Sequence, residues 1–221
     1  MKINEINSIL KTLTSIPAPS GFEARLNETL KSLWQPYSDE IEITKVGSFH
    51  ALKQGIANPP RRRLLLTAHL DQIGFMVNSI QDGFIKLTEI GGIDARLLPG
   101  QTIIIHGKQE IPAVIVQPAP FLMPKEFQSN PPPLNYLWAD AGMNPQKVSQ
   151  LISIGDIATF DQPYHELEND FVCSPGLDNR ASLAALTVCV QELAQRQTQW
   201  DTWFVASAQE EETQVGALSS T

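Results

Sequence analysis

The feature that most constrains this chain is an apolar run that ends in two polar side chains, RRRLLLTAHLDQIGFMV over residues 61–77. Its consecutive leucines at 64–66 predict a strand buried on both faces, as in the middle of an α/β sheet. His69 and Asp71 follow, and their spacing places both side chains on one face of an extended strand. A strand that only filled a core would not end in an imidazole and a carboxylate, so this end is predicted to be functional.

The sequence before this run predicts two helices and a strand pair. Apolar residues recur at helical spacing over residues 3–13. Ser20 and Glu23 match an S-x-x-E capping box, which predicts the start of a second helix. The predicted buried stripe of that helix comprises Phe22, Leu26, Leu30 and Leu33. Residues 40–55 alternate in the manner of strands, with a turn at Gly47.

The sequence pattern changes between Gly74 and about Phe160. Short alternating segments (FMVNSI, FIKLTEI, QTIIIHG, IPAVIVQP and DIATFD) are separated there by Gly, Pro and Asp. This pattern is typical of a small all-β unit such as a barrel. Helix and strand patterns return with DNRASLAALTVCVQELAQRQ and TWFVASA. We therefore predict an α/β unit made of residues 1–73 and 163–221, interrupted by a β-barrel over residues 74–162.

Composition narrows the class of protein. A net charge of −8 over 221 residues argues against binding to nucleic acid, whose phosphates require a basic face. The N-terminus lacks a signal-peptide pattern, and no apolar run reaches the roughly 18 residues of a membrane span. Cys173 and Cys189 have no CxxC spacing, which favours buried, reduced thiols and a cytoplasmic location.

Polar side chains are predicted to meet at the carboxyl ends of the buried strands. Glu210 and Glu211 follow the TWFVASA segment closely. Asp178 opens the long helix in SPGLDNRA, where the helix dipole favours a carboxylate. Ligand sites of open α/β sheets lie outside the carboxyl ends of the strands, so we expect these acids to converge with His69 and Asp71.

An imidazole among several carboxylates suits Zn²⁺, Co²⁺ or Mn²⁺, and the surplus of acids favours two metal ions. Singly, each residue type has a structural explanation: a hydrogen-bonded core histidine, an N-cap aspartate, a solvated glutamate run. Only their joint placement favours a metal site. No G-x-S-x-G, P-loop or H-E-x-x-H occurs, which argues against serine hydrolases, nucleotide-binding proteins and helix-borne zincins.

Five segments resemble, in order, the landmarks of the glutamyl, or tetrahedral (deblocking), aminopeptidase family of dinuclear metallopeptidases, some of which are labelled cellulase- or endoglucanase-like. They are TAHLDQIGFMV, GGIDARLLPGQTIII, GDIATFD, SPGLDNRASLAAL and ASAQEEETQVGA. LTSIPAPSGFEARL resembles the first helices of that family, so the resemblance covers essentially the whole chain. It implies a three-layer αβα catalytic domain interrupted by a β-barrel that serves in homo-oligomer assembly.

The resemblance also implies roles for individual residues. His69 would bind one metal ion, Glu211 the other, and Asp178 would bridge them. Asp71 would fix the tautomer of His69, and Glu210 would be the general base that takes a proton from the attacking water. The implied reaction is removal of one N-terminal residue from a short peptide, with Zn²⁺ or Co²⁺, or else Mn²⁺, as the cofactors.

The chain departs from that family near its C-terminal end. It ends at Thr221, whereas family members supply a later aspartate and a distant histidine as further ligands. The family's Q-E-E directly followed by V-G is QEEETQVGA here, and AVIVQPAPFL lacks a glycine and a histidine often seen in the barrel. Two functions stay open: an incomplete aminopeptidase, weakly active or inactive as this chain, and a non-catalytic homologue or assembly module that keeps the oligomerising barrel.

Overall fold

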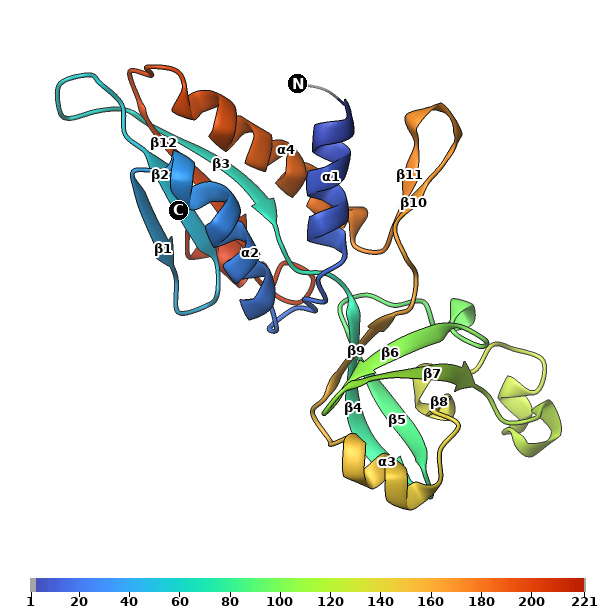
Figure 1. Cartoon of the computed structure of the whole chain (residues 1–221). Coiled ribbons are helices and arrows are strands. Elements are labelled where there is room, and N and C mark those ends of the chain that lie inside the picture. The colour runs from blue at the N-terminus through green and yellow to red at the C-terminus, as the bar shows by residue number, and fades with distance from the viewer. Residues whose placement is uncertain (1–2, 221) are drawn as a thin grey trace. The chain divides into compact units, whose positions relative to one another are not determined.

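The computed structural model describes residues 3–220, which form two compact units (Figure 1). The first is an α/β unit made of the chain up to Gln72 and from Pro163 onward. The second is a β-barrel unit, Ile73–Gln162. The mixed α/β character and the barrel that were expected from the sequence are both confirmed.

The α/β unit is built on one mixed sheet. Its strands, in spatial order, are β1 (Glu40–Ile43), β2 (Phe49–Lys53), β12 (Asp201–Ser207) and β3 (Arg63–His69). Strand β2 runs antiparallel to both of its neighbours, whereas β12 and β3 are parallel. The helices of this unit are α1 (Ile3–Thr14), α2 (Ala24–Trp34), α4 (Leu177–Ala194) and the short α5 (Val215–Leu218), and a separate hairpin pairs β10 (His165–Glu166) with β11 (Val172–Cys173).

The core of the α/β unit lies between the sheet and helices α1, α2 and α4. Trp34, at the end of α2, is fully buried and packs edge-on against Phe49 of β2 and Phe204 of β12, with ring centroids 5.6 and 6.4 Å away. Its indole N–H donates to the hydroxyl oxygen of Thr187 on α4 at 2.9 Å. This tryptophan therefore joins two helices to both central strands.

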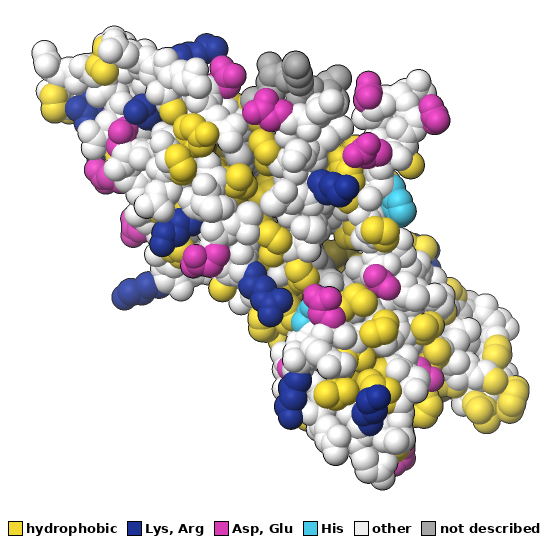
Figure 2. Space-filling model, viewed as in Figure 1, with side chains coloured by type: hydrophobic (Ala, Val, Ile, Leu, Met, Phe, Trp, Pro, Cys, Tyr) yellow, Lys and Arg dark blue, Asp and Glu magenta, His cyan; other side chains and the backbone are white. Residues whose placement is uncertain are grey.

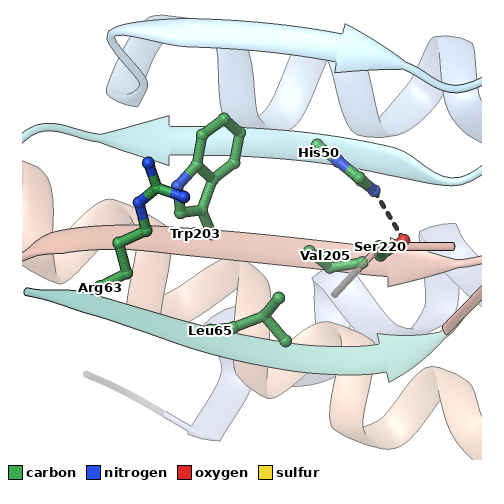
Figure 3. Close-up of a pocket in the computed structure, with 6 residues that line it drawn as sticks. All are labelled: His50, Arg63, Leu65, Trp203, Val205 and Ser220. Carbon is green, nitrogen blue, oxygen red and sulfur yellow. Dashed lines mark hydrogen bonds between the residues drawn. The ribbon is translucent and has the colours of Figure 1, made fainter. Parts of the chain in front are cut away.

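The prediction that the leucines at 64–66 are buried on both faces is wrong. Leu64 is 39% exposed and Leu65 is 40% exposed. The physical reason is that β3 is an edge strand and that α1, α2 and α4 cover only one face of the sheet. On the other face, Leu65 and Trp203 line a shallow pocket of about 480 Å³ (Figure 3). Within residues 3–220 no second helical layer covers this face, and the three-layer arrangement stays a prediction.

The predicted capping box is also wrong. Helix α2 begins at Ala24, and Glu23 makes no capping hydrogen bond with its side chain. The backbone N–H of Ser20, which a capping box would pair with Glu23, donates instead to the carbonyl oxygen of Gln72 at 3.2 Å. Leu26 and Leu30 are buried as expected, but Phe22 is 39% exposed because it lies in the turn before the helix.

The second unit is a closed barrel of six strands. In order around the barrel they are β4 (Gly74–Gln81), β5 (Phe84–Ile90), β8 (Trp138–Asp140), β7 (Glu110–Val116), β6 (Thr102–His106) and β9 (Ile157–Phe160). Five of them coincide with the alternating segments of the sequence, and their inward side chains form a separate core. Strand β8 was missed because it has only three residues and directly follows a proline-rich stretch. Helix α3 (Pro145–Leu151) follows β8 and is capped by the Asn144 side chain.

The cysteines differ from expectation. Cys173, in the β10–β11 hairpin, and Cys189, on α4, are both free thiols but exposed, so the predicted burial is wrong. The cytoplasmic location stays a prediction. Among residues 3–220 there is no helix whose length and apolar character would let it span a membrane.

We expect Trp34→Ala to lower the free energy of unfolding by about 3–5 kcal/mol, because it removes a large buried side chain and leaves a cavity. Urea unfolding followed by far-UV circular dichroism measures the change. Trp200→Ala is the matched control, since this residue is 42% exposed and its loss should shift stability by only about 0.5 kcal/mol. Equal effects of the two substitutions would contradict this account of the core.

Candidate metal centre

The parallel pair β3–β12 positions most of the candidate site. His69 is the last residue of β3, and its register partner is Ser207, the last residue of β12. The N–H of Leu70 donates to the carbonyl oxygen of Ser207 at 3.0 Å, which extends the pairing one step further. The segment that leaves β12 therefore turns beside the segment that leaves β3 (Figure 1). Glu210 and Glu211 lie in that turn.

Helix α4 brings Asp178 to the same edge. Gly176, just before the helix, has φ +68°, and a Cβ there would lie 2.8 Å from the side-chain oxygen of Gln72. The Gln72 side chain could move aside, so it is the left-handed backbone conformation that favours glycine here, and this turn lets the start of α4 lie against the segment that follows β3. Asp178, in the first turn, thereby reaches His69 from across the sheet edge.

The ligand-type atoms of these residues lie close together. His69 is 8% exposed, and its Nε2 lies 3.1 Å from Oδ1 of Asp178 and 3.8 Å from Oε2 of Glu210. One donor atom each from His69, Glu210 and Glu211 lies within 4.8 Å of the others, a spacing that suits a metal ion. Asp178 contacts His69 but is outside this group of three.

Asp71 connects the two segments of the chain that carry these donors, the one at the end of β3 and the one after β12. It is fully buried, and its Oδ1 and Oδ2 accept hydrogen bonds from the backbone N–H groups of Glu210 and Glu211, both at 3.1 Å. Nδ1 of His69 lies 3.2 Å from the backbone carbonyl oxygen of Asp71 and 3.5 Å from its Oδ1. One residue thus orients the imidazole and both glutamates.

Charge at the site is strongly negative. Burial alone would lower the pKa of His69, but hydrogen bonds and charges from Asp71, Asp178 and Glu210 outweigh it and raise that pKa to about 9. Burial and the neighbouring carboxylates also raise the pKa of Glu211, against the opposing charge of His69. Without a metal ion, a proton on the imidazole is the cation that balances these acids, and a divalent ion would replace it.

Arg180 is a functional candidate that the sequence reasoning did not identify. Its side chain is fully buried, and Nη1 donates to the carbonyl oxygens of Leu13 and Ile16 at 2.7 and 2.6 Å. Nε lies 3.4 Å from the carbonyl oxygen of Leu70, which follows His69 directly. Arg180 thus ties the end of β3 to the end of α1. Its place in the D-N-R segment gave no sign of this role.

The donor set fits a borderline divalent cation. An imidazole nitrogen and several carboxylate oxygens are what Zn²⁺, Co²⁺ and Mn²⁺ bind in proteins. Nδ1 of His69 faces Asp71, so the tautomer that donates from Nδ1 would leave the lone pair of Nε2 for a metal ion, on the side of the ring where Asp178 and Glu210 lie. The structure therefore brings His69, Glu210 and Glu211 together as candidate ligands, with Asp71 behind them and Asp178 beside His69.

Comparisons with known proteins agree with this geometry. Residues 47–221 match the M42 glutamyl aminopeptidase family. Lysyl aminopeptidase of Pyrococcus furiosus is 26% identical over 209 residues, which is 92% of this chain and 59% of the relative. Curated relatives of this kind align with more than 90% of this chain, but the chain spans only about 60% of their length.

Solved structures give the same result. Aminopeptidase APDkam598 from Desulfurococcus kamchatkensis has a TM-score of 0.89 and 26% identity, covering 99% of this chain and 60% of that one. The TET1 peptidase of Pyrococcus horikoshii, described as assembling into a tetrahedron or a large octahedral shell, has a TM-score of 0.83 and 27% identity, over 96% and 63% of the two chains. The chain therefore belongs to the M42 glutamyl aminopeptidase family, as its motifs predicted.

Proposed function

We propose that this chain carries the core of a dinuclear metal-dependent aminopeptidase, which removes N-terminal residues from short peptides. The observation that supports it is one imidazole and two carboxylates with donor atoms within 4.8 Å of one another at the ends of β3 and β12. Membership of an aminopeptidase family adds the reaction class. Zn²⁺ and Co²⁺ are the proposed ions, and Mn²⁺ suits the same donors.

In the proposed site His69 binds one ion, Glu211 binds the other, and Asp178 bridges them. The 3.1 Å contact between Nε2 of His69 and Asp178 supports this arrangement, because it brings the proposed ligand and the proposed bridge together. Asp71 holds Nδ1 and keeps Nε2 available. The bound ions would polarise the scissile carbonyl and lower the pKa of a water molecule.

Glu210 is the proposed general base. Its side chain is 36% exposed and lies 3.8 Å from Nε2 of His69, so it is next to the donors and still reaches solvent. A carboxylate in that position takes a proton from the attacking water and passes it to the leaving amine. Asp71 holds Glu210 and Glu211 by their backbone N–H groups, one on each of its carboxylate oxygens. These bonds do not use the side chain of Glu211, so its carboxylate remains available as the proposed ligand.

The ligand count bears on the activity of this chain. Catalytic zinc usually has three protein ligands, whereas the proposed roles give each ion one ligand of its own and a share of Asp178. We therefore propose weak or absent turnover for this chain alone, and further ligands in the complete active site. The match over about 60% of the relatives' length is consistent with that proposal.

The barrel surface favours a second candidate function, a module for assembly. Exposed hydrophobic side chains of this unit are visible in the lower part of Figure 2. The large exposed ones are Phe84, Leu97, Val114, Phe121, Leu122 and Ile154. Exposed apolar side chains of this kind often mark contacts between subunits, and the related TET1 peptidase is described as forming shells. We propose a homo-oligomer in either case, and catalysis distinguishes the two functions.

We expect Glu210→Gln to reduce the weak turnover of this chain to background while the bound metal is retained, because the amide cannot take up a proton and general-base catalysis contributes about 10²–10⁴-fold. Hydrolysis of amino-acid p-nitroanilides with added Co²⁺ or Zn²⁺ measures turnover, and atomic absorption measures the metal. Glu212→Gln is the control, since Glu212 is the next residue of the acidic run and has no proposed role. Loss of activity in Glu212→Gln instead would assign the roles one residue later. Stable oligomers without metal or turnover in the unsubstituted chain would favour the assembly module.

We expect Asp71→Asn to weaken Zn²⁺ or Co²⁺ binding about 10–100-fold. The N–H groups of Glu210 and Glu211 bond to different oxygens of Asp71, and asparagine would replace one of these oxygens with an NH₂ group that cannot accept. Asparagine also lacks the negative charge that stabilises a positively charged His69. Isothermal titration of the metal-free chain gives the affinity. The control is Asp161→Asn, an exposed position in the barrel unit. An unchanged affinity in Asp71→Asn would remove Asp71 from the proposed site.

A further inference from the structure

Glu23 carries a buried carboxylate that the proposed reaction does not use. The residue is 4% exposed, and its Oε1 accepts hydrogen bonds from the N–H groups of Gly21 and Gln209, at 2.8 and 3.1 Å. Gln209 is 186 residues further along the chain and directly precedes Glu210. Glutamates are almost never buried to this degree unless they are paired or hydrogen-bonded. The hydrogen-bond partners of this side chain therefore indicate its structural role.

Three consecutive backbone N–H groups point at buried carboxylates. The N–H of Gln209 donates to Glu23, and those of Glu210 and Glu211 donate to Asp71. Gln209 has φ +56°, in the left-handed region, and successive N–H groups converge on an anion in such turns. The protein's own acids occupy this concavity, so Glu23 and Asp71 together determine the path of the turn.

The turn also closes on itself. The carbonyl oxygen of Gln209 accepts from the N–H groups of Thr213 and Gln214, at 3.1 and 2.9 Å. The Gln209 side chain donates to the carbonyl oxygen of Val46 at 3.2 Å. The turn is therefore internally hydrogen-bonded, and its position depends on its hydrogen bonds to the rest of the unit. The bond to Glu23 connects it to the start of α2.

We propose that Glu23 is a positioning residue, whose acceptor oxygen holds the turn that carries Glu210 and Glu211 against the end of β3. This inference rests on the proposed function, because it assigns Glu23 to the same metal centre. A misplaced turn would separate the two glutamates from His69, and the affinity for metal would fall.

The charge of Glu23 is not what the turn requires. Burial raises the pKa of its carboxyl group, hydrogen bonds from Gly21 and Gln209 oppose that effect, and nearby Asp71 adds to the rise. The neutral amide of glutamine offers the same acceptor oxygen without a second buried negative charge. We therefore expect Glu23→Gln to preserve the turn and Glu23→Leu, which has no acceptor, to release it.

The experiment compares these two variants by hydrogen exchange and by metal titration. In the metal-free chain, peptides covering residues 204–214 should exchange about 10-fold faster in Glu23→Leu, while barrel peptides are unchanged. Co²⁺ affinity should fall about 10–100-fold in Glu23→Leu and stay within about 3-fold of the unsubstituted chain in Glu23→Gln. Glu28→Leu, at an exposed position on α2, the helix that Glu23 directly precedes, is the matched control.

Unchanged exchange and Co²⁺ affinity in Glu23→Leu would overturn the inference, and so would equal damage from Glu23→Gln. An unsubstituted chain that binds no Co²⁺ would contradict the proposed function instead, and the exchange comparison would still decide the role of Glu23. If Glu23→Leu loses the far-UV circular dichroism of the unsubstituted chain, Glu23→Ala removes the acceptor without adding branched bulk and gives the same comparison.

Discussion

The candidate site depends on the burial of the Asp71 carboxylate. A fully buried charge costs several kcal/mol unless hydrogen bonds and opposite charge compensate for it. Here two backbone N–H groups and an imidazole supply that compensation, and the pKa of Asp71 is lowered by them although burial opposes the shift. The contacts of this one carboxylate therefore hold residues 69, 210 and 211 in register across about 140 intervening positions.

The sheet brings the partners of these contacts close together. Because β3 and β12 are parallel and end at paired residues, the backbone pairing alone places the two following segments side by side. Arg180 then fixes the carbonyl oxygens around the end of β3, and Glu23 fixes the second segment. The site thus rests on buried polar groups beneath it, while Asp178 and Glu210 remain open to solvent. Rigid support beneath solvent-accessible carboxylates is what a metal centre of the proposed kind would require.

The sequence predicted those parts of the structure that follow from local patterns. Alternation predicted five barrel strands, and the i, i+2 spacing placed His69 and Asp71 at one strand end. Patterns could not show that β3 is an edge strand, since consecutive leucines look alike whether or not a layer covers them. Glu23 matched a capping signature but bonds to Gln209, because a contact across 186 residues leaves no local signal. The positions of the acids relative to His69 were likewise expected from topology alone, and the proposed roles of residues 69, 71, 178, 210 and 211 stay predictions.

Anomalous diffraction from crystals of the chain soaked in Zn²⁺ tests the central claim most directly. The account predicts a strong peak about 2.0–2.1 Å from Nε2 of His69, with a carboxylate oxygen of Asp178 beside it, and a second peak beside Glu211. It would be contradicted by zinc peaks confined to other surfaces while His69 keeps its hydrogen bond to Asp178.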